Sequence, residues 1–166
     1  MKKEEKIRLH LGCGDMILPG WINVDLFCEL ADIQADVRKL PFPDNYADEI
    51  YSSHVIEHFN FKEAFEVLRE WNRVLKPGGT IMIETPDMLA SCKKFVESSD
   101  EYRIANLYPH FFSEPWRGSG FYHLFLYTET QLRWTLEQCG FKNCQRQFAP
   151  RYIGKEDICL GMKAEK

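Results

Sequence analysis

The chain has 166 residues, enough for one domain with a hydrophobic core and too few for two ordinary domains. Its net charge of −4 at pH 7 argues against a nucleic-acid partner, since phosphates attract basic surfaces. No apolar run approaches the roughly 20 residues that span a bilayer. The charged start of the chain also lacks the apolar stretch of a signal peptide, so we expect a cytoplasmic protein. Together with the length and the short apolar runs, this predicts a single domain over residues 1–166 without a membrane span.

Strands and helices alternate through the first half of the chain. An apolar strand at residues 7–11 runs into a glycine turn, and further strands are predicted at residues 21–26, 33–36, 47–53 and 80–84. A helix begins after Asn60, which can cap it, with Glu63 at the position of a capping box. Apolar residues then recur at helical spacing until residues 76–79 stop the helix. The alternation predicts a largely parallel sheet with helices on both faces.

The second half begins with a helix at residues 88–96. Residues 97–127 mix aromatic residues with prolines and glycines, and so long a connection in a compact domain is usually functional. Thr128 can cap a further helix, with Gln131 at the capping-box position and Gly140 at its end. Two last strands are predicted at residues 143–148 and 157–163, where they could pair as an antiparallel edge.

The first chemical signal is a glycine turn followed by an acidic strand end. Gly12 and Gly14 follow the first strand, where glycine lets the backbone turn sharply and approach a ligand closely. Asp25 ends the second strand, and a carboxylate there can accept both hydrogen bonds from a ribose diol. A dinucleotide is disfavoured, because the last glycine of its fingerprint is replaced by Ile17 and Asp25 comes too early. The order of strand, turn, strand and carboxylate is typical of nucleoside binding.

Five segments carry a resemblance to a known family: LHLGCGD (9–15), WINVDL (21–26), DVRKLPFPDNYADE (36–49), SSHVIEHF (52–59) and LREWNRVLKPGGTIMIETP (68–86). Taken together, they resemble the class I S-adenosylmethionine-dependent methyltransferase family. Residues 127–141 also resemble the helix before the family's final hairpin. The resemblance implies an α/β, Rossmann-like fold with a mostly parallel seven-stranded sheet whose last strand is antiparallel.

The resemblance also implies S-adenosylmethionine as the cofactor and a set of residues that hold it. The turn would lie against the methionine part of the cofactor, Asp25 would hold the ribose hydroxyls, and Ser53 and His54 would face the amino-acid end. Around the adenine, Leu26 would pack on the ring, Asp36 would accept from the amino group and Val37 would supply a backbone contact. The full cofactor set implied by the resemblance is Leu11, Gly12, Cys13, Gly14, Asp25, Leu26, Asp36, Val37, Ser53 and His54.

Two features depart from the family pattern at the methionine end. Met16 occupies the position of a third glycine. Only about ten residues separate the first two strands, whereas a parallel crossover usually needs a dozen or more. The first helix must therefore be shortened or replaced by a turn.

Histidines supply the candidate catalytic groups. His54, Glu57 and His58 follow the fourth strand, and a hydroxyl acceptor would benefit from a general base. If residues 55–59 are helical, His54 and His58 share one face, a spacing that could also hold a metal, although hydrogen bonding or packing is the commoner role. His123 lies in a segment where relatives often place an active-site histidine. We take His58, His123 and His54 as the catalytic candidates and expect no bound metal.

The predicted function is methyl transfer to a small-molecule acceptor, and the resemblance suggests a sugar or glycolipid hydroxyl. Residues 97–127 would form the acceptor-binding insertion, where His110, Trp116 and Arg117 could shape the pocket. The alternative is a catalytically silent module that binds S-adenosylmethionine or a partner protein. A nicotinamide-dependent reductase is disfavoured by the turn spacing, and the oligomeric state is not encoded in any pattern that we recognise.

Overall fold

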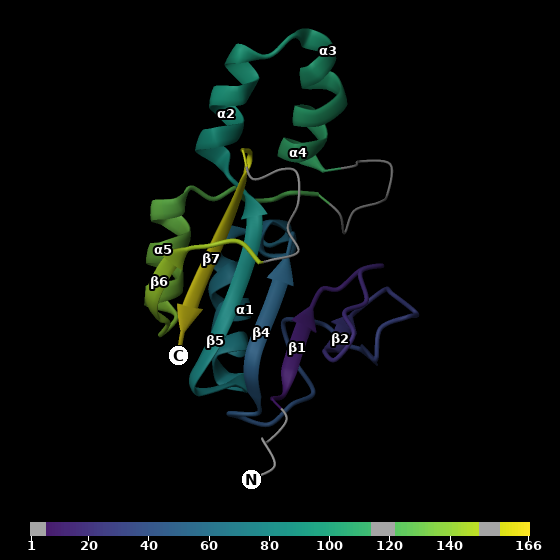
Figure 1. The fold of residues 1–166 in the computed structure, drawn as a ribbon, viewed down its shortest axis with the longest axis vertical. Helices are drawn as coiled ribbons and strands as arrows, with labels where there is room; N and C mark the ends of the chain where they lie inside the picture. The colour runs from purple at the N-terminus through teal and green to yellow at the C-terminus, as the bar shows by residue number, and fades with distance from the viewer. Residues whose placement is uncertain (1–5, 114–121, 150–156) are drawn as a thin grey trace.

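The computed structural model describes residues 6–113, 122–149 and 157–166 and contains a seven-stranded sheet (Figure 1). The strand order is β3-β2-β1-β4-β5-β7-β6, in which β7 runs antiparallel to both of its neighbours. The strands are β1 (Arg8–Leu11), β2 (Ile22–Asp25), β3 (Ile33–Gln34), β4 (Ala47–Ser53), β5 (Leu75–Pro86), β6 (Lys142–Arg146) and β7 (Cys159–Glu165). The predicted fold class, with its antiparallel last strand, is confirmed.

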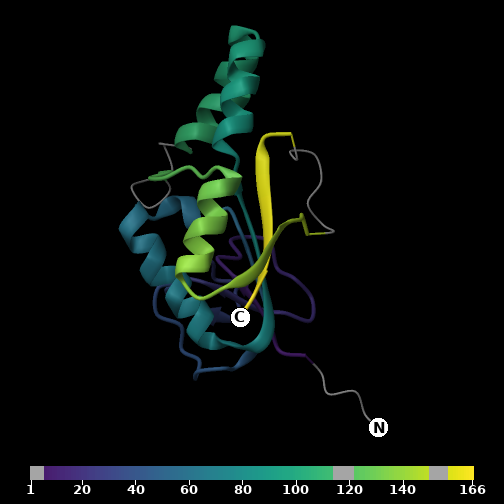
Figure 2. The same ribbon diagram turned by 90° about the vertical axis from the view of Figure 1, so that its left-hand side faces the viewer.

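Helices α1 (Phe61–Val74) and α5 (Glu129–Gln138) cover one face of the sheet (Figure 2). The strands turn every second side chain towards these helices, and these side chains are almost all apolar and buried. Examples are Leu9, Ile50, Ile81, Ile83 and Met162, each at most 1% exposed. Successive side chains of a strand point to opposite faces of the sheet, so this alternation places the apolar core on the face that carries α1 and α5.

The opposite face carries no helix in the described part of the chain, which corrects the expectation of helices on both faces (Figure 2). Polar and aromatic side chains satisfy one another there instead. The His10 ring stacks on Tyr51, whose hydroxyl donates to Glu84 Oε2. A hollow of about 340 Å³ opens on this face, between Trp21, Tyr51, Met82 and Lys163 among others. The connection between β1 and β2, about ten residues, is shorter than the dozen or more that a helical crossover usually needs.

The connection between β1 and β2 shows this directly. The structure takes the second of the two expected alternatives, a turn in place of the first helix. Gly12 N and Cys13 N both donate to Val24 O, and Met16 N donates to Cys13 O. Asn23 closes the loop, since its Oδ1 accepts from Leu18 N and its Nδ2 donates to Leu18 O. The backbone groups are paired by these turns, so the short connection needs no helix.

Helix α1 begins as the sequence predicts. Asn60 Oδ1 accepts from the backbone of Lys62 and Glu63, and the Glu63 side chain accepts from Asn60 N, which makes a complete capping box. Its buried face includes Trp71, whose Nε1 donates to Val37 O. The helix therefore fixes the backbone carbonyl of Val37 beyond β3. Past the helix, β5 begins at Leu75, earlier than predicted, because Gly78 and Gly79 exchange backbone bonds with Lys166.

A helical lobe stands beyond the carboxyl ends of β4 and β5 (Figure 1). It consists of α2 (Met88–Glu97), α3 (Asp100–Tyr102), the π-helical turn η2 (Arg103–Leu107) and α4 (Tyr108–Phe112). The sequence predicted an irregular connection after residue 96, but Ser99 caps a new helix there and Pro109 fits its first turn in α4. No helix among the described residues is long and apolar enough to cross a bilayer.

Replacing Asn60 with Ala removes the side-chain oxygen that caps α1. We expect the free energy of unfolding to fall by about 1 kcal/mol, measured by urea denaturation. Asn60→Asp keeps an acceptor at the same place and should stay within a few tenths of a kcal/mol of the wild type. Equal stability of the Ala and Asp variants would contradict this account of the helix start.

Candidate functional site

The glycine turn lies where β1 ends and is held against the end of β2. Gly12 and Gly14 have φ of +67° and +48°, in the left-handed region that favours glycine. Gly12 N donates to Val24 O at 2.8 Å, so the turn folds back over the neighbouring strand. The residues Leu11 and Cys13 on either side of Gly12 are buried. The turn is therefore a hydrogen-bonded segment of backbone, held in place at the carboxyl ends of the strands.

Gly12 also touches the segment that follows β4. A Cβ atom at Gly12 would overlap the Val55 side chain. Ser52 strengthens this junction, since its hydroxyl donates to Leu11 O at 3.0 Å. The absence of a side chain at Gly12 thus lets the β1 turn and the residues after β4 approach each other closely.

Asp25, at the end of β2, joins two turns through its carboxylate. Its Oδ2 accepts from Gly14 N at 2.9 Å, and its Oδ1 accepts from Phe27 N and Cys28 N at 2.8 and 3.0 Å. The side chain is partly exposed. A carboxylate has about four lone-pair sites, so Asp25 keeps capacity for one further bond.

The three residues predicted to surround an adenine lie near the ends of β2 and β3. Leu26 is 46% exposed, which leaves its side chain open to a ligand. Asp36 binds Arg38 through Nε and Nη2, and this pairing holds the pKa of Asp36 below its ordinary value. Val37 is buried, with its carbonyl taken by Trp71. The Asp36 carboxylate is thus already paired, and an adenine amino group would have to share it with Arg38.

His54 lies just past Ser53, the last residue of β4, and its backbone has φ of +55°. His54 N donates to Glu84 O, and its ring contacts Glu57 through Nδ1 at 3.0 Å and Cys159 Sγ through Nε2 at 3.9 Å. Burial alone would lower the pKa of His54, but the bonds with Cys159 and Glu57 raise it above its ordinary value. His54 is therefore held as the cationic partner of Glu57.

Glu57 is fully buried and accepts from four groups. His54 Nδ1 binds Oε1, Thr85 Oγ1 donates to Oε2 at 3.0 Å, and the Glu57 carbonyl accepts from Leu124 N and Phe125 N. Burial alone would raise the pKa of Glu57, but the His54 hydrogen bond and charge hold it below its ordinary value. A buried carboxylate is stable only when paired in this way.

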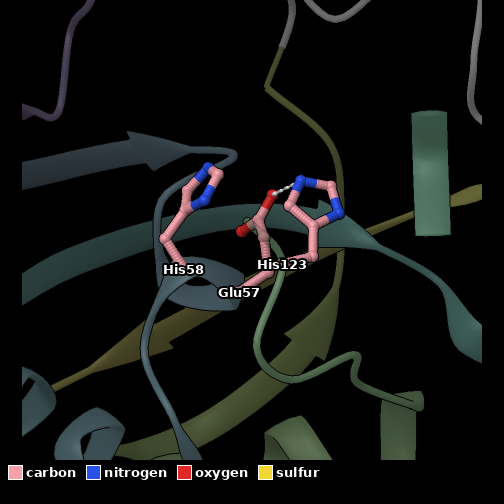
Figure 3. Close-up of side chains that lie close together, drawn as sticks. All are labelled: Glu57, His58 and His123. Carbon is pink, nitrogen blue, oxygen red and sulfur yellow. Dashed lines mark ion pairs between the residues drawn. The ribbon is translucent and has the colours of Figure 1, made fainter. Parts of the chain in front are cut away.

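His58 and His123 come from distant parts of the chain and meet beside Glu57 (Figure 3). Their rings lie edge to face with centroids 5.0 Å apart, and His123 Nε2 is 4.0 Å from Glu57 Oε1. His58 Nδ1 lies 3.1 Å from Tyr122 O, and His123 Nδ1 lies 2.9 Å from His110 O. A carbonyl oxygen only accepts, so both Nδ1 atoms must carry a proton, and in the neutral form of each ring the lone pair lies on Nε2.

The structure thus brings His54, His58 and His123 into one cluster around Glu57, but not as the helical spacing predicted. Residues 56–58 form a single 3₁₀ turn, η1 (Ile56–His58), so His54 and His58 do not share a helix face. His110 joins through its carbonyl, while its own Nε2 lies 2.9 Å from Ile158 O. Trp116 and Arg117, also predicted to shape an acceptor pocket, lie outside the described residues.

Sequence reasoning did not single out Thr85, Tyr127 or Cys159. Thr85 follows the predicted fifth strand, and its place at the carboxyl end of that strand is a signal that could have found it. The Tyr127 hydroxyl is buried with no hydrogen-bond partner among the described residues, and burial with the charge of Glu57 raises its pKa. Cys159 contributes only through β7, whose register no local pattern encodes.

Comparisons with known proteins match the middle of the chain in sequence and the whole chain in fold. A family model described as "Methyltransferase domain" matches residues 22–83, from β2 through most of β5. A ubiquinone/menaquinone biosynthesis C-methyltransferase from Neisseria gonorrhoeae is 45% identical over 49 residues, which are 30% of this chain and 19% of that protein. The match therefore spans about a fifth of that relative's length.

Solved structures extend the likeness to the whole chain at the level of the fold. A methyltransferase from Methanosarcina mazei, described as dependent on S-adenosylmethionine, has a TM-score of 0.66 at 16% identity, over 99% of this chain and 93% of that one. A second, from Archaeoglobus fulgidus, has a TM-score of 0.64 at 18% identity, over 99% of this chain and 87% of that one.

The close approach of Gly12 to Val55 can be tested by placing a side chain at residue 12. Gly12→Ala and Gly78→Ala both place a side chain at positive φ, which costs about 1–2 kcal/mol. Only the Gly12 variant also overlaps a neighbour, since nothing lies within 4 Å of a Cβ at Gly78. We expect Gly12→Ala to lose about 1–3 kcal/mol more in urea denaturation, from overpacking. Equal losses in the two variants would show that the close approach is not a constraint.

Proposed function

We propose that this chain is a class I S-adenosylmethionine-dependent methyltransferase and that it transfers the methyl group of S-adenosylmethionine to a hydroxyl of a small acceptor. One observation carries the proposal. The nucleoside-type turn with Asp25 and the cluster of His58, His123 and Glu57 lie at adjacent strand ends, joined by the contact of Gly12 with Val55. A cofactor on the turn would therefore present its reactive end to the cluster.

The cofactor would lie along the carboxyl edge of the sheet, from β3 to β4. Asp25 would accept from one ribose hydroxyl in addition to its three backbone partners, and the exposed Leu26 would cover one face of the adenine. The backbone at Gly12 and Gly14 would contact the methionine part. Ser53 and His54 would lie at the amino-acid end, where the cationic His54 suits a carboxylate.

Methyl transfer then needs an acceptor oxygen in line with the sulfonium methyl. The oxygen forms the new C–O bond while the C–S bond breaks and its electron pair returns to sulfur, leaving neutral S-adenosylhomocysteine. The hydroxyl proton must leave during this step. The Nε2 lone pairs of His58 and His123 can take it, since both Nδ1 positions are committed to carbonyls.

A sugar or glycolipid hydroxyl is the acceptor that we propose. The lobe beyond the cluster exposes aromatic rings, including Tyr108 at 47% and Phe112 at 58%, and such rings stack against the apolar faces of sugars. The relative named as a C-methyltransferase of ubiquinone and menaquinone biosynthesis offers a second candidate class, a ring carbon of a quinol. That match covers 30% of the chain.

A catalytically silent binding module is the second candidate. It is favoured by the sheet face that carries no helix in the described part of the chain and has a hollow of about 340 Å³. Such a module would bind the cofactor without turning it over.

The direct test measures S-adenosylhomocysteine release from the full chain with a panel of sugars, a glycolipid and a quinol. We expect release with a hydroxyl acceptor and transfer of the methyl group to oxygen. His123→Gln should lower kcat by about 10²–10⁴-fold, because it removes the Nε2 lone pair, and should leave S-adenosylhomocysteine affinity unchanged.

Each other outcome overturns part of the proposal. Cofactor binding without turnover over the whole panel would select the silent module. Methylation of carbon in the quinol alone would replace the sugar acceptor. An unchanged kcat in His123→Gln would remove that residue from the reaction.

A further inference from the structure

We infer that Glu57, His58 and His123 bind one divalent transition-metal ion of the zinc type. One ligand atom from each of the three side chains lies within 4.8 Å of the other two (Figure 3). Two imidazoles and a carboxylate, with further positions open, form the donor set of catalytic zinc and of non-haem iron sites. From the sequence, His58 is paired with His54 and no metal is expected, because hydrogen bonding or packing is the commoner role of such histidines. The fold instead places His58 beside His123.

Both imidazoles are oriented as metal ligands usually are. A ligating histidine donates its other ring N–H to a carbonyl or carboxylate, which fixes the tautomer and the ring plane. His58 does this through Tyr122 O and His123 through His110 O. The two rings therefore each keep an Nε2 lone pair, and neither Nε2 has a hydrogen bond among the described residues.

The carboxylate is oriented in the same manner. Thr85 Oγ1 donates to Glu57 Oε2, and His54 Nδ1 holds Oε1. Each carboxylate oxygen has two lone pairs, so Oε1 can keep its bond with His54 and still bind an ion. These two partners fix the plane of a side chain that is fully buried.

The backbone brings the three ligands together before any ion binds. Leu124 N and Phe125 N donate to Glu57 O at 2.8 and 3.1 Å, which fastens the segment of His123 to the turn of Glu57 and His58. The gap of 4.0 Å between His123 Nε2 and Glu57 Oε1 must shorten to about 3.3 Å for tetrahedral zinc with bonds of about 2.0–2.1 Å. Small rotations of the His123 and Glu57 side chains would shorten the distance between these two atoms by the required amount.

An ion can enter from the side of His58, which is partly exposed, whereas the side chains of His123 and Glu57 are only 8% and 0% exposed. A bound ion would leave a position for the oxygen of a hydroxyl acceptor. It would lower the pKa of that hydroxyl, and the proton would pass to water, because both Nε2 lone pairs would be bound to the ion. The role of His58 and His123 as bases therefore belongs to the metal-free chain. This use of the ion rests on the proposed function, whereas its binding does not.

The test is a calorimetric titration of the chelator-treated full chain with Zn²⁺. We expect one ion per chain in the wild type. His58→Gln and His123→Gln should each bind on the order of 100-fold more weakly, and the double variant should not bind at this site. Cys92→Ser is the matched control for thiol binding, since Cys92 is the only exposed cysteine, and it should bind like the wild type.

A second readout needs no variant. The visible spectrum of the Co²⁺ form should show coordination by nitrogen and oxygen without charge transfer from thiolate. Equal Zn²⁺ affinity in the wild type and the double variant, or no binding by the folded wild type, would overturn the inference. S-adenosylhomocysteine is titrated separately into the metal-free chain. Zn²⁺ binding without cofactor binding would overturn the proposed function alone, and the reverse would overturn the metal site alone.

Discussion

Glu57 imposes the main constraint on this molecule, because a buried carboxylate without partners would cost several kcal/mol. Its carboxylate is hydrogen-bonded to His54, just past the end of β4, and to Thr85 of β5. Its backbone carbonyl accepts hydrogen bonds from Leu124 N and Phe125 N. Three segments that are distant in sequence therefore meet at one residue. The position of His123 beside the strand ends follows from these bonds. The candidate chemistry depends on them, whether the cluster acts as a base or holds an ion.

The sheet that carries this cluster is covered by helices on one side only, in the part of the chain that the structure describes. This arrangement has a direct cause in the sequence. Alternate residues of β4 and β5 are polar or aromatic, such as Tyr51 and Glu84, and they bond to each other in place of a helix. Gly12 turns at the carboxyl end of β1, and no helix lies between β1 and β2. The methionine end of the proposed cofactor site is thus built from backbone turns.

Much of this could be predicted from local patterns. The turn at Gly12, the carboxylate of Asp25 and the cap at Asn60 each express short-range rules of backbone geometry, and the structure places all three as expected. The pairing of His58 with His123 could not be predicted, because it arises from backbone bonds between distant segments. The helices of residues 100–112 were missed because aromatic residues and Pro109 resemble a loop when their caps are not recognised.

In the proposed site Asp25 holds the ribose of S-adenosylmethionine, and a comparison of ligand affinities tests this contact. S-adenosylhomocysteine is titrated calorimetrically into the wild type, Asp25→Asn and Asp32→Asn. Asp32 is a matched control, a nearby carboxylate that accepts from Asn23 and has no proposed ligand contact. The account predicts binding that weakens by about 1.5–3 kcal/mol in Asp25→Asn alone, since a hydrogen bond to a charged group is lost. Equal affinity in all three folded proteins, or no binding by the wild type, would contradict it.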